Sequence, residues 1–462
     1  MTPHRRRQQS FGDGLIREEV SDLWEPWMRH ADQIMEDDSL VEIVQAALSK
    51  RCQKSKTRGR PGTPADVVLR LLILKHLRDW SFEETTREVR ANLVYREFTR
   101  IGAGAVPDDK SISRFGRQLG PEIVEKLHQR LVSIAQENKV VKGRKLRVDT
   151  TVVETNIHYP TDSTLLGDGV RVLTRVMMKV RAVAGAVVTS VRDRTRSVQR
   201  RLLEIVRASR DKSEKGQQKL TAAYRKLLDI SSRVVGQAKK FSTELLHKRR
   251  AGLRRAKRQL DEMIPRVQQV MQQTRQRVLR GNTRAEGKIV SVFEPETEVI
   301  RKGKASKPNE FGKLVKIQEA ENQILTHYEV YDQRPSDSEL LTPSIEQHIQ
   351  QFGHAPRLAA ADTGFFSGAN EAQAKQLGVK WVAVPSQSTK STQRKQTQKK
   401  RWFKKAQAWR TGCEGRISVL KRRHGLHRSR YKGTDGMRRF VGLGVIADNL
   451  WHVGTELAKR KK

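Results

Sequence analysis

Apolar residues recur at helical spacing through the first third of the chain. Residues 20–50 carry an apolar stripe that predicts one or two helices. A clearer helix is predicted after Thr63 and Pro64, because Thr63 can cap it and Pro64 suits a first helical turn. Residues 1–19 are basic and polar, and they predict a loose arm.

Further short helices follow before residue 140. They are predicted from a capping box at Ser81–Glu84, from a cap at Asp108 or Asp109, and from an apolar pattern over 121–137. Short helices with basic surfaces are compatible with a helix-turn-helix-like DNA reader. They are also compatible with a plain helical bundle that only packs on the next domain. Periodicity slightly favours this plain bundle and leaves both interpretations open.

The pattern changes to that of a strand near Lys145. The run from Lys145 to Val153 predicts a short strand that carries one carboxylate, Asp149, in apolar surroundings. Further strands are predicted at 288–293, 313–318, 324–331, 358–362 and 381–385, helices at 336–352 and 368–377, and two last helices beginning near Cys413 and Arg438. This order predicts a mixed α/β domain that has a long all-α insertion after its first strand.

The predicted insertion is long, helical and very basic. Apolar residues fall three or four apart from 173 to 263, with Pro265 as an interruption. Residues 169–280 hold 30 Lys and Arg against 8 Asp and Glu. A solvated helical hairpin would present charged outer faces, but the excess of one sign favours an arm that contacts phosphates.

These patterns define the expected domain organisation. We expect a flexible basic arm at 1–19, a helical N-terminal domain at 20–140 that is a candidate for DNA binding, a catalytic domain at 141–168 and 285–455, the basic helical insertion at 169–284, and a basic tail at 456–462.

Charge then narrows the class of partner. The 462 residues include 92 Lys and Arg against 51 Asp and Glu, a formal net charge of +41, which predicts a polyanion such as nucleic acid as the usual partner. An anionic membrane is the competing partner, but no apolar run approaches the roughly 20 residues of a spanning helix. The N-terminus does not resemble a signal peptide.

Two cysteines in unrelated contexts, Cys52 and Cys413, exclude a disulfide framework and a cysteine zinc site, and they predict a cytoplasmic location.

Three carboxylates are the candidate chemistry. Asp149 lies in the first strand, Asp362 ends the apolar run 358–361 before a glycine, and Glu414 opens an amphipathic segment behind a basic stretch. Taken singly, each has an ordinary explanation, as a strand-end residue or as a helical ion pair with Arg410 or Lys421. Taken together in a basic protein, they suggest metal-assisted chemistry on phosphodiesters, for which oxygen ligands hold Mg²⁺.

Several segments together resemble bacterial insertion-sequence transposases with an RNase H-like DDE catalytic domain. The nearest grouping is the ISNCY type. The resemblance rests on Val106–Phe115, Val148–Ser163 and Ala361–Phe366, on Arg410, Glu414 and Lys421 of the signature Tyr-x2-Arg-x3-Glu-x6-Lys, and on His424–Leu426, Arg430–Gly433 and Ala447–Leu450. Gln407 stands where the signature has Tyr.

The resemblance implies an RNase H-like mixed sheet and a function. Asp149, Asp362 and Glu414 would hold two Mg²⁺ ions, with Mn²⁺ as a substitute, and water and then a 3′-hydroxyl would attack phosphodiesters of double-stranded DNA. Arg410 and Lys421 would grip phosphates, although either can instead pair with Glu414. A homodimer joining two element ends is implied, with no membrane and no small-molecule cofactor, in the bacterial cytoplasm near the nucleoid.

Other residues are assigned to DNA binding with less support from their spacing. Trp402 and Trp409 precede Glu414 in a basic run and could stack on an unpaired base, although tryptophans at such positions are more often core residues. Lys404, Lys405 and Arg114 complete the predicted DNA-binding set. Cys413 is expected to be a small packing residue.

Two other functions compete with an active transposase. A domesticated, catalytically inactive relative would only occupy DNA, and it would be expected to lack a carboxylate. A basic RNA-binding protein would be expected to carry aromatic-rich strands, but only 5% of the residues are aromatic.

Overall fold

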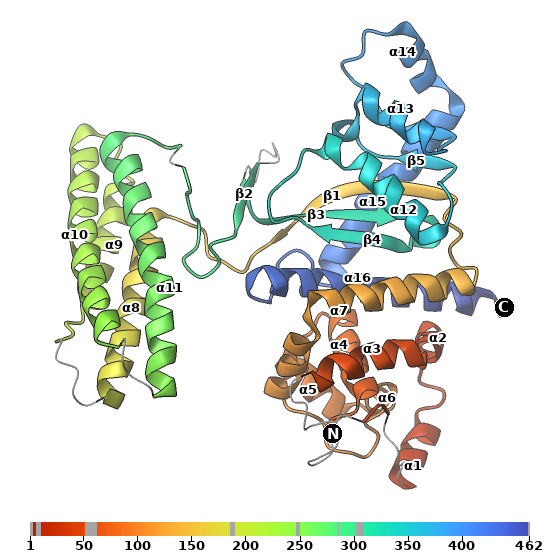
Figure 1. Ribbon diagram of the computed structural model, residues 1–462, viewed down its shortest axis with the longest axis horizontal. Helices are drawn as coiled ribbons and strands as arrows, with labels where there is room; N and C mark the ends of the chain where they lie inside the picture. Colours follow the sequence, from red (N-terminus) through yellow and green to blue (C-terminus); the bar gives the residue numbers. More distant parts are fainter. Residues whose placement is uncertain are drawn as a thin grey trace. The chain divides into compact units, whose positions relative to one another are not determined.

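The computed structural model describes residues 3–5, 11–50, 62–184, 190–245, 250–284, 286–301 and 309–460. The described chain is mostly helical and contains one mixed β-sheet (Figure 1). Its contacts divide it into two compact units, one made of Met1–Asn156 with Ile300–Lys462 and the other of Ile157–Val299. None of the described helices is long and apolar enough to cross a membrane.

The first unit begins with seven helices. They are α1 (Phe11–Glu19), α2 (Pro26–Ile34), α3 (Asp38–Ser49), α4 (Ala65–Leu77), α5 (Phe82–Ala91), α6 (Leu93–Phe98) and α7 (Asp109–Glu137). The predicted capping box is present, because Ser81 Oγ accepts from the Glu84 amide and Glu84 accepts from the Ser81 amide. Asp108 caps α7 as predicted, and Gly120, with φ +73°, kinks α7 before Pro121.

Two predictions about the N-terminal region are wrong. Residues 11–19 form α1 instead of a loose arm, and Arg5 pairs with Glu36 and Asp38. Helix α4 begins at Ala65 with Pro64 in the capping position, so Thr63 is not its cap.

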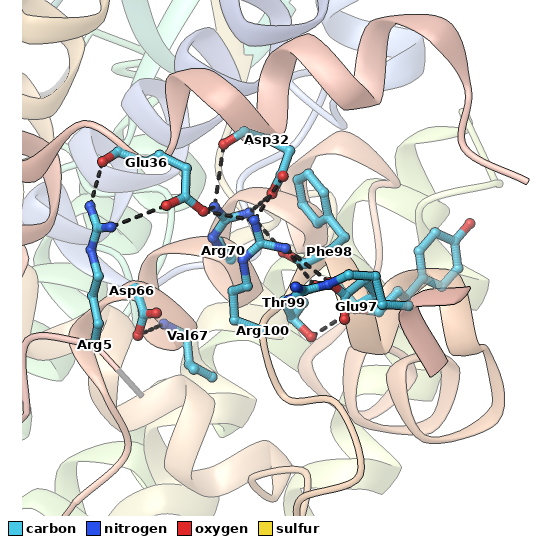
Figure 2. Close-up of polar contacts among 12 residues, drawn as sticks. Arg5, Asp32, Glu36, Asp66, Val67, Arg70, Glu97, Phe98, Thr99 and Arg100 are labelled. Carbon is cyan, nitrogen blue, oxygen red and sulfur yellow. Dashed lines mark hydrogen bonds and ion pairs between the residues drawn. The ribbon is translucent and has the colours of Figure 1, made fainter. Parts of the chain in front are cut away.

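A buried arginine ties these helices together (Figure 2). The Arg70 side chain is 1% exposed and pairs with Asp32 and Glu36, while its Nη1 donates to the Phe98 carbonyl over 2.9 Å. Arg100 Nη2 reaches the same two carboxylates at 2.8 and 2.7 Å. Buried charges are tolerated only when they are paired in this way.

Helix α16 (Gly433–Arg460) links the N-terminal helices to the sheet. Leu443, Leu450 and Val453 pack among the N-terminal helices, whereas Val441 and Val445 pack against the sheet. A Cβ on Gly442 would lie 2.2 Å from Tyr328 Oη, so only glycine permits this approach. The helix starts before the predicted Arg438, and it includes residues 456–460, which were expected to form a tail.

The six-stranded sheet has the order β2-β3-β1-β5-β6, with β4 paired to β3. The strands are β1 (Lys145–Glu154), β2 (Glu298–Arg301), β3 (Asn309–Glu319), β4 (Leu325–Val330), β5 (Leu358–Ala360) and β6 (Trp381–Ala383). Strands β1 and β3 are antiparallel, whereas β1, β5 and β6 are parallel to one another. The mixed α/β class is therefore confirmed.

Helices cover both faces of this sheet. Helices α12 (Leu341–Phe352) and α13 (Gly368–Gln376) pack on one face, where Ile345 and Ala374 meet Val148. Helices α15 (Arg401–Arg423) and α16 pack on the other face, where Leu420 and Val441 contact Val153. Side chains alternate along β1, so odd-numbered residues such as Arg147 and Asp149 point towards α15.

Other sequence predictions need correction. Residues 288–293 contain no strand. Val292 packs into the helical core of the second unit, and Ser291 Oγ accepts hydrogen bonds from the backbone amides of Phe293 and Glu294 in a turn. Helix α15 begins at Arg401, so Glu414 lies within the helix and does not open it. The short helix α14 (Thr392–Lys399) was not predicted.

In its described residues, the second unit is a bundle of four helices. They are α8 (Asp162–Ala184), α9 (Thr195–Ala208), α10 (Glu214–Glu244) and α11 (Ala251–Thr274), which continues without a break through Pro265 into a π-helical turn, Arg275–Leu279. Apolar side chains from all four form one core. The buried Asp162 pairs with Arg277 Nε at 2.7 Å and accepts from Gln273 at 3.1 Å.

Candidate active site

Asp149 lies in the middle of β1, just beyond the residues that pair with β5, and Asp362 follows the end of β5. The last paired residues of β1 and β5 are Arg147 and Ala360, and each aspartate follows its strand partner by two positions. The two therefore occupy equivalent positions at the edge where the pairing of β1 with β5 ends. Ala360 packs against Phe403 of α15, so alternation directs Asp362 to the face that Asp149 also uses.

Each aspartate is held locally by its own backbone. Asp149 Oδ1 accepts from the Thr150 amide, and Asp362 Oδ1 accepts from the Thr363 amide, both at 2.7 Å. Asp149 is partly buried, with its side chain 15% exposed, whereas Asp362 is exposed. The second aspartate is thus the more accessible to a ligand from solvent.

Helix α15 brings Glu414 to the same edge through Arg410. Arg410 Nη2 contacts Glu414 Oε1 at 3.0 Å, and Arg410 Nη1 lies 3.8 Å from Asp149 Oδ2. One guanidinium therefore lies between two of the three predicted carboxylates. The alternative considered from sequence, that Arg410 pairs with Glu414, is what the structure contains.

The described residues include no group of three His, Cys, Asp or Glu side chains close enough to hold a metal. Asp149 and Glu414 nevertheless share a cation, the Arg410 guanidinium. Carboxylate oxygens are the donors that Mg²⁺ prefers. These donors are of the right kind for a divalent ion, but the described structure does not bring the three carboxylates together into a metal site, and an ion bound to Asp149 and Glu414 would compete with Arg410.

Gln407 occupies the position at which the resembled signature has Tyr. Its Nε2 donates to the carbonyls of Ala361 and Ala383, and the Ala361 bond is 3.4 Å long. Because Ala361 precedes Asp362, this amide ties α15 to the ends of β5 and β6 beside the second aspartate.

The predicted DNA-binding residues are placed on two regions of the first unit. Lys404 and Lys405 are exposed on α15, Lys421 lies on the same helix, and Arg114 is exposed on α7. Trp402 packs on Trp381 with ring centroids 4.6 Å apart, and both Trp402 and Trp409 join a small apolar cluster with Phe403. Their positions agree with the core interpretation, and base stacking stays a prediction.

Sequence reasoning gave no role to Asp337, a carboxylate near the turn after Asp362 and on the face of β1 opposite to Asp149. Its Oδ1 accepts from Thr150 Oγ1 at 3.3 Å, and its Oδ2 lies 3.1 Å from where a Cβ on Gly364 would be. It thus lies between the residue after Asp149 and the turn that follows Asp362. The capping box of Ser336 and Glu339 marked a helix start but gave no sign of this placement.

Cys413 is buried on α15 beside these charges, as the packing interpretation predicted. Burial, together with the nearby carboxylates of Glu319 and Asp149, raises the pKa of the Cys413 thiol well above its ordinary value. The thiol is therefore held neutral and is a poor metal ligand or nucleophile.

Two segments match known protein families. Residues 26–118 match the transposase domain DUF772, and residues 371–453 match a transposase DDE domain. No curated protein and no solved structure matches the chain. The second match includes Arg410, Glu414 and Lys421 but begins after Asp362. Together the two matches indicate a transposase of the DDE type found in insertion sequences.

Proposed function

We propose that this transposase cleaves double-stranded DNA at the ends of its insertion sequence and joins the freed ends to a target. Asp149, Asp362 and Glu414 are the catalytic carboxylates in this proposal. The observation that carries it is the arrangement of β1, β5 and α15, because the two aspartates occupy matching positions in the register of β1 and β5 and the helical glutamate shares Arg410 with one of them.

The sheet order supports an RNase H-like catalytic domain. Strands β4, β3 and β1 form an antiparallel run, and β5 and β6 extend it in parallel with β1. The four helices of Ile157–Val299 follow β1 in the chain, as a helical insertion after the first strand would. We assign the chain to the transposases that carry the signature Tyr-x2-Arg-x3-Glu-x6-Lys, because it has Arg410, Glu414 and Lys421 at the signature spacing. Gln407 stands in place of the signature Tyr.

Mg²⁺, or Mn²⁺ in its place, is the proposed cofactor, with two ions held by the three carboxylates. Bound there, the ions would polarise the phosphate and activate the attacking oxygen. The chain's own contribution is to hold Asp149 and Asp362 on a rigid sheet edge and Glu414 on a helix packed against it. Arg410, once released from Glu414, is placed to contact a phosphate near the cut.

DNA binding is supported by charge in both units. In the first unit we assign it to Arg410, Lys421, Lys404, Lys405 and Arg114, and in the second to the exposed basic surface of the bundle. We propose that two copies act together, because two element ends must be joined. An inactive DNA-occupying relative is the second candidate, and Arg410 pairing with two carboxylates is the observation that favours it.

Cleavage of a labelled duplex that carries the inverted repeats flanking the gene tests the proposal. With Mg²⁺ or Mn²⁺ we expect cuts at the repeat ends. Asp149→Asn, Asp362→Asn and Glu414→Gln should each lower the rate about a thousandfold or more, because several kcal/mol of transition-state stabilisation is lost.

DNA affinity should persist in all three variants, and Asp332→Asn is a matched control that removes an exposed carboxylate paired with Arg438 on α16. Tight repeat binding with no cleavage in either metal would instead favour the DNA-occupying relative.

A further inference from the structure

The contact between β1 and α15 is centred on a buried residue that the proposed reaction does not use. Arg147 precedes Asp149 by two positions on β1 and points to the same face of the sheet. It is 5% exposed, although arginine is seldom buried unless it is paired. Its partners therefore indicate what it holds.

Those partners lie on two other elements. Nη1 of Arg147 donates to the main-chain carbonyl of Trp409 on α15, and Nη2 donates to Glu319 on β3. The guanidinium also lies 4.8 Å from the centroid of the Trp409 ring. Arg147 and Glu319 are directly opposite in the β1–β3 register. A single side chain thus joins two strands to one helix.

The helix is shaped to receive this guanidinium. A Cβ on Gly412 would lie only 2.6 Å from Arg147 Nη1, so a larger residue there would displace either the helix or the arginine. In the sequence, Gly412 lies between Glu414 and Arg410, whose guanidinium lies 3.0 Å from Glu414 and 3.8 Å from Asp149. The close approach is therefore located at the part of α15 that carries the candidate chemistry.

We propose that Arg147 is the positioning residue that fixes α15 on the sheet and so sets Glu414 and Arg410 opposite Asp149. This inference rests on the proposed function for its catalytic consequence, but not for its structural part. Glu319 holds the guanidinium in place, and Gly412 leaves the room that the contact requires. Breaking the buried pair leaves an uncompensated charge beneath the helix, which favours its displacement.

Thiol labelling of Cys413 measures the docking without any reference to catalysis. Cys413 lies on the face of α15 that packs on the sheet near Arg147, and it is buried while the helix is docked there. In a Cys52→Ser background, Arg147→Met should speed its reaction with a disulfide reagent about tenfold or more, as expected for the loss of a charged hydrogen bond. Gly412→Ala should do the same while retaining both charges.

Arg70→Met is the matched control, because Arg70 is also buried and doubly paired but contacts Asp32, Glu36 and Phe98 instead of α15 (Figure 2). It should leave Cys413 labelling unchanged. Equal acceleration by Arg70→Met and Arg147→Met would overturn the proposal, because labelling would then report general destabilisation. Unchanged labelling in both Arg147→Met and Gly412→Ala would overturn it as well.

Cleavage assays then test the catalytic consequence. Arg147→Met should lower the cleavage rate about a hundredfold, the scale of a misplacement near 1 Å, with DNA affinity unchanged. Lysine has no planar guanidinium to meet the methyl group that Gly412→Ala adds. In an Arg147→Lys background, Gly412→Ala should therefore lower the cleavage rate less than it does in the parent protein. Faster labelling with a normal cleavage rate would overturn the positioning role. If the parent protein cleaves no DNA, the proposed function fails, and labelling still decides whether Arg147 docks the helix.

Discussion

Around Arg147 and Asp149 of β1, charged side chains are buried or held against one another, whereas the four-helix unit has an apolar core and, although Asp162 is buried, carries many charges at exposed positions. Arg147 and Glu319 are both buried and paired, and Arg410 is 12% exposed between two carboxylates. In the bundle, Arg233 and Asp229 pair at 2.8 Å while remaining 61% and 57% exposed. The same residue types thus occupy two different electrostatic environments.

If the protein binds DNA as proposed, the two environments correspond to two ways in which its charges act on phosphates. A buried or confined charge depends on exact partners, because its desolvation must be offset by fixed contacts. An exposed charge contributes mainly to a field that attracts phosphates, and its contribution depends on number more than on position. We therefore expect the first unit to be sensitive to single substitutions and the bundle to be sensitive to total charge.

Removal of one buried arginine should have the largest effect on stability. Arg416 is 5% exposed and donates to both oxygens of the buried Asp448 at 3.0 and 3.3 Å. Arg416→Met leaves that carboxylate without its arginine partner beside His424 and His452, so we expect a loss of about 3–5 kcal/mol in the free energy of unfolding. Urea denaturation followed by hydrogen exchange in α15 and α16 measures this loss.

Arg233→Met is the matched substitution in the bundle, since it also removes an arginine paired with an aspartate. Its exposed pair should contribute less than about 1 kcal/mol. If Arg416→Met and Arg233→Met lowered the free energy of unfolding equally, the distinction between the two units would be removed.

Acid should weaken the first unit through a buried histidine. His128 is 2% exposed, and its Nε2 lies 2.9 Å from the Leu325 carbonyl oxygen. Burial lowers the pKa of His128 from 6.5 to about 4, although this hydrogen bond acts in the opposite direction. Between these values the unfolded chain binds a proton that the folded chain does not, so stability falls as the pH falls from about 6.5 to 4, by up to about 1.4 kcal/mol per unit.

His128→Gln should reduce this acid slope, because glutamine can donate to the same carbonyl but does not titrate. His158 of the bundle is a suitable control, since its side chain is 50% exposed beside Asp168. His158→Gln should leave the acid slope of the first unit unchanged. An undiminished slope in His128→Gln would assign the acid sensitivity to other buried groups.

Local pattern was sufficient for much of the fold. The capping box before α5, the cap of α7 and the strand carrying Asp149 all follow from residue spacing. The strand expected at 288–293 failed because apolar alternation does not distinguish a strand from an extended segment packed on helices. The start of α15 was misplaced because its first turns are rich in Lys and Arg, which suggest a loop by charge although both are good helix formers.

The candidate site was predictable only in part. Asp149, Asp362 and Glu414 were identified from their surroundings and from a resemblance, and the parallel register of β1 and β5 gives the two aspartates equivalent positions. The contacts of Arg147 and Asp337 were not predictable. They depend on strand register and on how closely α15 approaches the sheet, and neither is encoded in the spacing of nearby residues.

The effect of exposed charge should be the smallest for each residue and should accumulate with number. Arg254, Arg255 and Arg258 are exposed on α11, and replacing all three with Gln preserves helix propensity. If the bundle contacts phosphates, the slope of log affinity against log salt should fall by up to about 2.7, roughly 0.9 for each lost contact, equally for repeat and random DNA. The matched control replaces Arg171, Arg233 and Lys257, which pair with aspartates within the bundle, and should change the slope less. An unchanged slope in the exposed triple variant would mean that these side chains face only solvent, as in a plain helical bundle, and DNA binding would then depend on the first unit alone.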